Sequence, residues 1–342
     1  MKIFLASILL SMAFVGCAVD DAAVDVDPTE ESAIDAKADG GTRIPDVACN
    51  GTPDANLPRV EFRHDSSRFI SLAKPHHRGL DLIAAASTRT QVLRGWISYG
   101  KVDKSLPDEK VEIFACRAGA WKLIGNTITG DDGFFELKLT GAKRLPVGMR
   151  DMYVSVAGDR SGTRFLAYVA PDGTNLMISD VDGTLTSSEN AFVETVVLGT
   201  EPSARAGAAH AYEAAKAKGY QLVYVTARGN QYTTETRDWL SHQGFPRGPV
   251  RLSESFVTLP GADTVNYKTS TFKNIDTNLT IAAGVGNRAS DIEAYSNIGL
   301  TAAQIFIETP EYESEVAPKI SAGLATGFAT YDELRTKYLS KL

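Results

Sequence analysis

The chain has 342 residues, 43% of them hydrophobic and 23% charged, so it can fold into about two ordinary domains and is not disordered throughout. Its net charge of −7 arises mainly in residues 18–41, which hold eight acidic residues and one lysine. From residue 42 onward the chain is close to neutral. Because no overall positive field would attract nucleic acid, we expect no nucleic-acid partner.

Residues 1–17 are predicted to direct export. Lys2 precedes an apolar run that is too short to be a permanent membrane anchor. The run ends in "FVGC", which resembles the lipobox of bacterial lipoproteins, although Phe14 stands where leucine is usual. The resemblance implies that Cys17 is acylated and anchors the protein to the bacterial cell envelope, on the periplasmic or outer-membrane face. The alternative is an ordinary secretory signal with a coincidental cysteine.

Residues 18–80 are predicted to be an acidic flexible tether, because their first part lacks the large apolar groups that a core needs. Two further cysteines, Cys49 and Cys116, are a candidate disulfide in an oxidising compartment. The sequence fixes neither their distance nor their orientation, so this pairing stays open.

Residues 81–172 are predicted to form a small all-β sandwich. Short segments with partial period-two alternation are separated by turn residues such as "GDDG". In one of them we expect Phe135, Leu137 and Leu139 to face the core, with Glu136 and Lys138 facing water. The predicted strand segments are 90–100, 109–119, 120–130, 133–141 and 149–159.

Residues 173–342 change to alternating strands and helices, which predicts a Rossmann-like α/β domain: a parallel sheet with flanking helices. The active crevice of such a sheet lies beyond the carboxyl ends of its strands. The predicted strands are 176–180, 221–228, 280–287 and 303–309, and the predicted helices are 203–218, 231–243, 289–299 and 330–342.

The first strand of this domain ends in the sequence Asp180-Val181-Asp182-Gly183-Thr184. Two carboxylates this close repel each other unless a cation offsets their charge, and Mg²⁺ with oxygen ligands suits them. Asp180 could attack phosphorus and form an aspartyl-phosphate. Asp182 could then protonate the leaving alkoxide and later activate water.

Three later segments supply the remaining groups of the predicted site. In "VYVTARG", Thr226 and Arg228 could hold phosphate oxygens. Further along the chain, Lys268 could balance the negative charges, and Asn287 and Asp291 could complete the metal site. Each residue alone has an ordinary explanation, such as a turn, a helix cap or a solvated lysine. All four segments occur in order, however, and each stands where we expect a strand to end.

With these motifs, the chain resembles the haloacid dehalogenase superfamily. The finer resemblance is to the lipin-type phosphatidate phosphatase (LNS2) domain and to its relative in the retinal-degeneration-B class of phosphatidylinositol-transfer proteins. It covers about residues 90–315 and rests on "DVDGTLTSSE", "YVTARG", "GFPRGPVRLS", "GNRASDIEAYSNIGL" and "QIFIET". It implies catalysis by Asp180, Asp182, Thr226 and Lys268. It further implies substrate contacts from Gly183, Thr184 and Arg228, and Mg²⁺ held by Asp180, Asp182, Asn287 and Asp291.

One departure separates the two relatives. The transfer-protein class typically lacks the nucleophilic aspartate and is thought to bind phosphatidate without hydrolysing it, whereas Asp180 and Asp182 are both present here. We therefore expect a phosphomonoester hydrolase.

The spacing of the motifs leaves no room for a large lid domain, which favours a bulky substrate such as a lipid phosphate on a phospholipid membrane. The alternatives are a phosphatidate-binding sensor without turnover and a phosphatase for soluble esters.

Overall fold

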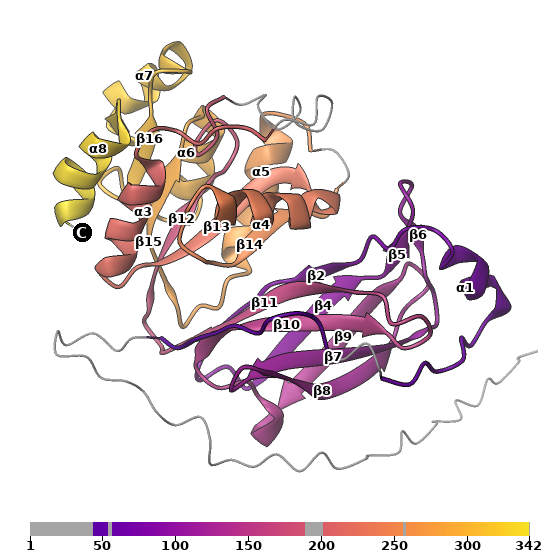
Figure 1. Cartoon of the computed structure of the whole chain (residues 1–342). Coiled ribbons are helices and arrows are strands. Elements are labelled where there is room, and N and C mark those ends of the chain that lie inside the picture. Colours follow the sequence, from indigo (N-terminus) through magenta and orange to yellow (C-terminus); the bar gives the residue numbers. More distant parts are fainter. Residues whose placement is uncertain (1–43, 54–56, 189–200, 256–257, 342) are drawn as a thin grey trace, which may run out of the picture.

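The computed structural model describes residues 44–53, 57–188, 201–255 and 258–341. The predicted export signal, Cys17 and the strongly acidic segment lie outside these residues, as do residues 189–200 between Thr184 and the helix predicted at 203–218. Figure 1 shows two domains: a sandwich domain from residue 44 to 170 and a parallel-sheet domain from residue 175 to 341.

The sandwich domain is built from two layers, a larger mixed sheet in which two of the strand pairs are parallel and a smaller antiparallel sheet. The larger sheet has the order β3 (Leu82–Ala85), β11 (Gly162–Ala170), β10 (Gly148–Val156), β7 (Lys110–Arg117) and β8 (Ala120–Ile128), with β1 (Asp46–Val47) beside β10. The smaller sheet is β2 (Arg78–Leu80), β4 (Thr90–Trp96) and β9 (Phe134–Thr140), and β5 (Ser98–Tyr99) pairs with β6 (Lys104–Ser105).

The predicted sandwich and its side-chain alternation are confirmed. Phe135 and Leu139 are buried in the core between the layers, Leu137 packs against it, and Lys138 is exposed. Each predicted strand segment contains a strand, whereas β1, β2, β3, β6 and β11 were not predicted.

The described residues before 81 differ from the predicted tether. They form α1 (Asp65–Ile70) and β1, and Cys49 is joined to Cys116 by a disulfide with a Cα–Cα distance of 5.7 Å. Phe62 and Ile70 pack against the sandwich core. The predicted boundary at residue 80 was therefore too late, because the acidic composition that suggested a tether ends near residue 41 and apolar residues follow it.

The second domain is a parallel sheet of six strands. Their order is β14 (Val250–Ser253), β13 (Gln221–Gly229), β12 (Asn175–Ser179), β15 (Thr280–Gly286), β16 (Ile305–Glu308) and β17 (Thr326–Phe328), and every neighbouring pair is parallel. In chain order this is 3-2-1-4-5-6, the doubly wound arrangement whose ligand crevice lies where the order reverses. The reversal falls between β12 and β15.

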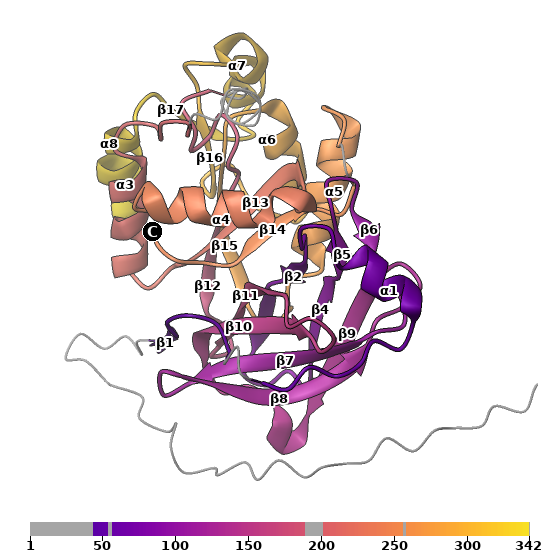
Figure 2. The same cartoon turned by 45° about the vertical axis from the view of Figure 1, so that its right-hand side comes forward.

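Helices cover both faces of this sheet (Figure 2). On one face, α3 (Ala208–Ala217), α4 (Thr233–His242) and α8 (Tyr331–Glu333) pack on strand residues such as Met177 and Leu222. On the other, α5 (Ala262–Lys273), α6 (Ala289–Ser296) and α7 (Glu313–Ser321) pack on Leu176 and Ile178. No helix in the described ranges combines the length and the apolar character needed to cross a membrane.

The two domains share a hydrophobic cluster. Ile83, Leu166 and Tyr168 of the sandwich domain belong to the same cluster as Ile178. Asp81 lies at this junction with a fully buried side chain. It accepts hydrogen bonds from the Leu166 N–H (2.7 Å), the Val250 N–H (2.8 Å) and the Arg237 guanidinium (3.0 and 3.1 Å).

Candidate functional site

The predicted site residues gather at the carboxyl ends of β12 and β15. Asp180 follows β12 directly, and its backbone N–H donates to the Val285 carbonyl of β15 at 3.0 Å. Asn287 follows β15 in the same way. The two segments therefore lie side by side at the point where the strand order reverses.

Lys268 joins two carboxylates from distant parts of the sequence. Its Nζ donates to Asp180 Oδ1 and to Asp291 Oδ1, each at 2.6 Å, and its side chain is 4% exposed. Burial alone would lower the pKa of Lys268, but the two carboxylates reverse this and raise the pKa above its ordinary value. Lys268 lies in the middle of α5 and not at a strand end, so the predicted local structure was wrong at this residue.

Asp291 also fixes the start of α6. Its Oδ2 accepts the backbone N–H groups of Asn287 (3.1 Å) and Arg288 (3.0 Å), as a carboxylate in the first turn of a helix can. A Cβ at Gly286 would lie 2.5 Å from this carboxyl group, so glycine is required for the close approach.

Thr184 connects the two strand ends. Its hydroxyl lies 2.9 Å from Asp180 Oδ2 and 3.2 Å from Asn287 Oδ1, and its side chain is fully buried. The structure thus brings Asp180, Thr184, Lys268, Asn287 and Asp291 into one buried group.

Asp182 belongs to a second, neighbouring group. Its carboxylate accepts hydrogen bonds from the Thr226 hydroxyl (2.7 Å) and from Arg228 (Nε at 2.8 and 2.9 Å, Nη2 at 2.5 Å). Arg228 Nη1 also donates to Thr236 Oγ1 at 3.1 Å. Thr226 and Arg228 were predicted to hold phosphate oxygens and Asp182 to bind a metal ion. In this structure the three residues bind one another, and those roles stay predictions.

Gly183 and Thr184 were predicted to contact substrate, but both are buried and bonded within the protein. The Gly183 N–H donates to Thr186 Oγ1 at 2.8 Å, and the Gly183 carbonyl accepts from Arg205 at 2.8 and 3.1 Å. The Thr184 carbonyl accepts from the Tyr331 hydroxyl at 2.6 Å. Sequence reasoning missed Arg205 and Tyr331, because both are distant in the chain and neither belongs to a motif.

The donor set for a metal ion consists of oxygen atoms. Asp180, Asp291 and Asn287 offer carboxylate and carboxamide oxygens within one buried group, which is the chemistry that Mg²⁺ prefers. Within the described ranges, no group of three or more His, Cys, Asp or Glu side chains is arranged to hold a metal. The oxygens of Asp180, Asn287 and Asp291 suit Mg²⁺, although Lys268 holds one oxygen of each aspartate. The Asp182 carboxylate is bonded to Arg228, and its role as a metal ligand stays a prediction.

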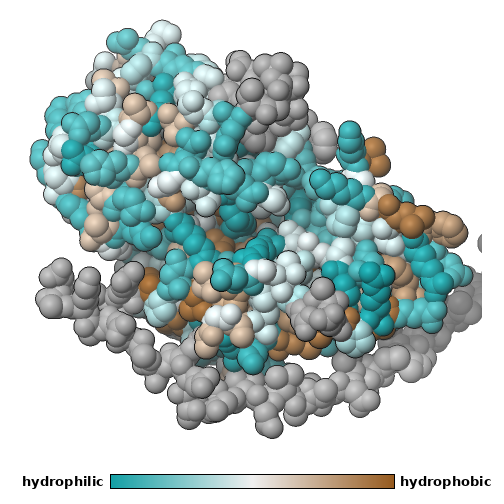
Figure 3. Space-filling view, viewed as in Figure 1, coloured by the Kyte–Doolittle hydropathy of each residue, from teal (hydrophilic) through white to brown (hydrophobic). Residues whose placement is uncertain are grey.

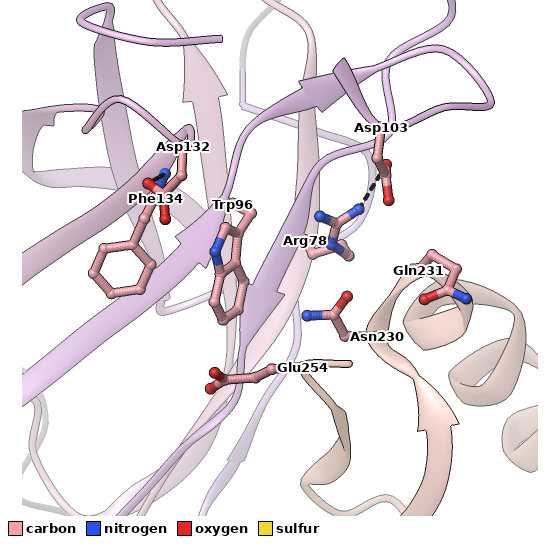
Figure 4. Close-up of a pocket in the computed structure, with 8 residues that line it drawn as sticks. All are labelled: Arg78, Trp96, Asp103, Asp132, Phe134, Asn230, Gln231 and Glu254. Carbon is pink, nitrogen blue, oxygen red and sulfur yellow. Dashed lines mark hydrogen bonds and ion pairs between the residues drawn. The ribbon is translucent and has the colours of Figure 1, made fainter. Parts of the chain in front are cut away.

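A hollow of about 490 Å³ lies where the two domains meet, and none of the candidate site residues lines it. The sandwich domain lines it with Arg78, Trp96, Asp103, Asp132 and Phe134, and the parallel-sheet domain with Asn230, Gln231 and Glu254. Figure 4 shows the Trp96 ring near Glu254 and the Arg78 guanidinium bonded to Asp103. Asn230 and Gln231 directly follow β13, the strand that carries Thr226 and Arg228.

Comparison with known families matches both domains. Residues 75–169 match the family described as "PITM 1-3, beta-sandwich domain", and residues 177–309 match "PITM 1-3, LNS2 domain". Membrane-associated phosphatidylinositol transfer protein 3 of Mus musculus is 29% identical over 266 residues, which are 75% of this chain and 26% of that protein. Protein retinal degeneration B of Drosophila melanogaster is 29% identical over 276 residues, 77% of this chain and 21% of that protein.

The likeness to solved structures is weak. A putative beta-phosphoglucomutase from Thermotoga maritima is 14% identical with a TM-score of 0.36, over 49% of this chain and 100% of that chain. The deoxy-D-mannose-octulosonate 8-phosphate phosphatase YrbI from Haemophilus influenzae is 13% identical with a TM-score of 0.33, over 49% of this chain and 88% of that chain. Likenesses of this size carry no inference about the site.

The sequence matches thus cover both domains but only part of each relative, since the chain spans about a quarter of the length of the curated relatives it matches. Within that part, the chain is similar to the β-sandwich and LNS2 domains of the PITM 1-3 proteins.

Proposed function

We propose that the protein is a Mg²⁺-dependent phosphomonoester hydrolase of the haloacid dehalogenase type. The observation that carries the proposal is the placement of Asp180. This carboxylate lies at the reversal point of a doubly wound sheet, bonded to Lys268 and Thr184, with a second acid, Asp182, two residues on.

The chain's own residues would act in two steps. An Asp180 oxygen attacks phosphorus and bonds to it while the ester oxygen leaves with its electron pair, and Asp182 gives that oxygen a proton. Asp182 then takes a proton from water, which attacks the aspartyl-phosphate, releases phosphate and restores Asp180. A phosphate that binds Arg228 would compete with Asp182 for the guanidinium and so free this acid for proton transfer.

Mg²⁺, held by oxygens of Asp180, Asn287 and Asp291, would supply positive charge to offset that of the phosphate and the carboxylates. Lys268, charged and buried between Asp180 and Asp291, would keep both carboxylates in place and ionised.

A lipid phosphate such as phosphatidate is the proposed substrate. The relatives' names refer to membrane association and phosphatidylinositol transfer, and both domains match families of those proteins. We further propose export and a lipid anchor at Cys17 on the bacterial envelope. The Cys49–Cys116 disulfide supports an oxidising compartment, because cytosolic conditions rarely preserve such bonds.

The test measures phosphate release from phosphatidate vesicles, an aryl phosphate and soluble sugar phosphates, with Mg²⁺ and with a chelator. We expect release from phosphatidate that requires Mg²⁺ and disappears in Asp180→Asn. Asp238→Asn, which removes an exposed carboxylate on α4, is the matched control and should keep full activity. Unchanged turnover in Asp180→Asn would refute the nucleophile assignment.

A second candidate is a lipid-sensing module that binds phosphatidate without turnover. The closed pairing of Asp182 with Arg228 and Thr226 favours it, since that acid is engaged within the protein. Binding to phosphatidate vesicles with no released phosphate would select this function. Faster release from soluble sugar phosphates than from lipid would select a phosphatase for soluble esters.

A further inference from the structure

Three apolar side chains protrude at one end of the sandwich domain. Phe69, Leu72 and Val102 are 76%, 83% and 87% exposed, and no other large hydrophobic residue in the described ranges is exposed as much. Hydrophobic surface gathers at the right-hand edge in Figure 3, where α1 and the β5–β6 turn lie in Figure 1. Exposed apolar groups that cluster in this way mark an interaction surface.

The two segments that carry these side chains pack against each other. The Gly100 N–H donates to the Lys74 carbonyl at 2.8 Å, and Pro75 forms an isolated bridge with Tyr99. Gly100 has a φ of +74°, a conformation that favours glycine and turns the chain into the tip that carries Val102. The protruding side chains therefore belong to one surface.

Positive charge surrounds this surface. Lys74, Lys101 and Lys104 are exposed, and no carboxylate among the described residues forms an ion pair with any of them. The nearest acid in the β5–β6 turn, Asp103, is bonded to Arg78 at 2.8 Å and to His76 at 2.6 Å. Glu61 is paired with Arg68. Asp65, in the first turn of α1, is exposed as well, so the three lysines exceed this acid in the charge near the surface.

We propose that Phe69, Leu72 and Val102, together with Lys74, Lys101 and Lys104, form a docking patch that inserts into an anionic phospholipid surface. Apolar tips enter the acyl region while lysines remain at the level of the head groups. A protein partner fits this composition less well, because lysine is depleted in protein interfaces.

The docking patch is connected to the candidate site. His76 Nδ1 bonds to Asp103 in the β5–β6 turn, and its Nε2 lies 3.0 Å from the carbonyl oxygen of Gln231, just beyond β13. Insertion of the patch would therefore hold the carboxyl edge of the parallel sheet, with Asp180, near the bilayer. This inference builds on the proposed function, since it explains how a lipid phosphate would reach that edge.

The test places an environment-sensitive dye at the tip of the patch. Val102→Cys is labelled in the full chain carrying Cys17→Ser. Because Cys49 and Cys116 are joined in a disulfide, the introduced cysteine is then the only free thiol. Leu324→Cys, 46% exposed in the other domain, is the matched control. With vesicles of equal parts phosphatidylcholine and phosphatidylserine, we expect a blue shift at position 102 and none at position 324. The shift should weaken with phosphatidylcholine alone.

A second variant tests the patch without a dye. In the same Cys17→Ser background, Phe69→Ser, Leu72→Ser and Val102→Ser together should lower the vesicle partition coefficient by about tenfold or more, since the apolar groups that enter the bilayer are lost. Because all three positions are exposed, the melting temperature should stay near that of the parent. Turnover of a soluble aryl phosphate should also be unchanged.

Equal dye shifts at positions 102 and 324, or no shift in vesicle-bound protein, would overturn the proposal. So would a shift that appears without vesicles and grows with protein concentration, because it would assign the patch to self-association. The Asp180→Asn variant separates the two proposals: it should lose turnover and keep the dye shift. If the labelled protein keeps its turnover but shows no dye shift with vesicles, the docking patch is refuted and the proposed hydrolase function is not.

Discussion

Two sets of carboxylates in this protein differ in their main hydrogen-bond partners. At the edge of the parallel sheet, Asp180 and Asp182 are bound by side chains, those of Lys268, Thr184, Thr226 and Arg228. In and beside the sandwich domain, three buried carboxylates bind backbone N–H groups, although Glu112 there binds the side chain of Arg160, and Asp291 at the sheet edge also binds backbone N–H groups. The Glu109 carboxylate accepts the backbone N–H groups of Arg63 and His64, and the Asp151 carboxylate accepts that of Cys49. The Asp81 carboxylate accepts the backbone N–H groups of Leu166 and Val250.

On the proposed function, Asp180 and Asp182 are the reactive acids, whereas Glu109, Asp151 and Asp81 are structural. A carboxylate that binds backbone groups fixes the path of the chain, and its loss leaves buried donors without a partner. A carboxylate that binds side chains can exchange those partners for a substrate or an ion. Substitutions in the two sets should therefore affect different properties, and four experiments test the contrast.

The largest effect is expected for Lys268→Met. This change leaves Asp180 and Asp291 without their shared cation, so it should lower the unfolding free energy by about 3–5 kcal/mol and abolish turnover. Denaturant unfolding and phosphate release measure the two effects. Lys273→Met, an exposed position on the same helix, is the control and should change neither. A Lys268→Met protein as stable as the parent would contradict the charged state assigned to this group.

Asp182→Asn should act on the chemistry and not on the fold. Loss of the acid should slow release of phosphate from an alkyl ester by roughly 10²–10⁴-fold, with a change in unfolding free energy of only about 1 kcal/mol. With an aryl phosphate, whose leaving group needs no proton, a burst of phenol without equal phosphate should appear. Unchanged turnover of the alkyl ester would remove Asp182 from the mechanism.

A change of pH should affect the sandwich domain through His77. Burial lowers the pKa of His77 to about 4, so the folded protein holds it neutral while the unfolded chain protonates it below about 6.5. The unfolded state then binds more protons, and stability should fall by about 3 kcal/mol between pH 6.5 and 4.

The control for this pH effect is His77→Gln. Because glutamine does not titrate, most of the fall in stability between pH 6.5 and 4 should be absent in this variant. The pKa values of Asp103 and Asp276 lie below their ordinary range, so these acids titrate below this window. Parallel stability curves for the parent and His77→Gln between pH 4 and 6.5 would show that His77 is not the cause.

The smallest effect is expected for Asp81→Asn. The change weakens bonds that join the domains and should cost about 2 kcal/mol of unfolding free energy, with unaltered turnover of a soluble aryl phosphate. A double-mutant cycle with Arg237→Gln would isolate the coupling between the two side chains. Additive effects of the two substitutions would contradict a direct bond.

The sequence was sufficient to predict the alternating strands and helices and the segments that carry Asp180, Asn287 and Asp291. Strands of a parallel sheet are buried on both faces, so they appear as short apolar runs between polar helices. Polar residues at their ends therefore stand out. Alternation in β9 was equally clear, because one of its faces packs on a core and the other meets solvent.

Other features could not be predicted in this way. Helix α5 is rich in threonine and other weak helix formers, so its pattern did not reveal that Lys268 is helical. Strand β14 has four residues and follows two prolines. The hydrogen bonds of Thr184, Arg205 and Tyr331 depend on tertiary packing, as do the bonds of Asp81 at the junction between the domains. A local sequence pattern shows that a strand is buried, but it does not show which other element packs on it.

The hydrophobic cluster that spans both domains has a consequence for how such proteins can be divided. Cutting the chain between β11 and β12 would expose Ile83, Leu166 and Tyr168 on one piece and part of the Ile178 layer on the other. Each fragment would expose an apolar surface to water and tend to aggregate. The two domains should therefore be transferred together, and a graft of the parallel-sheet domain alone into another protein would need a substitute for the apolar surface that the sandwich domain provides.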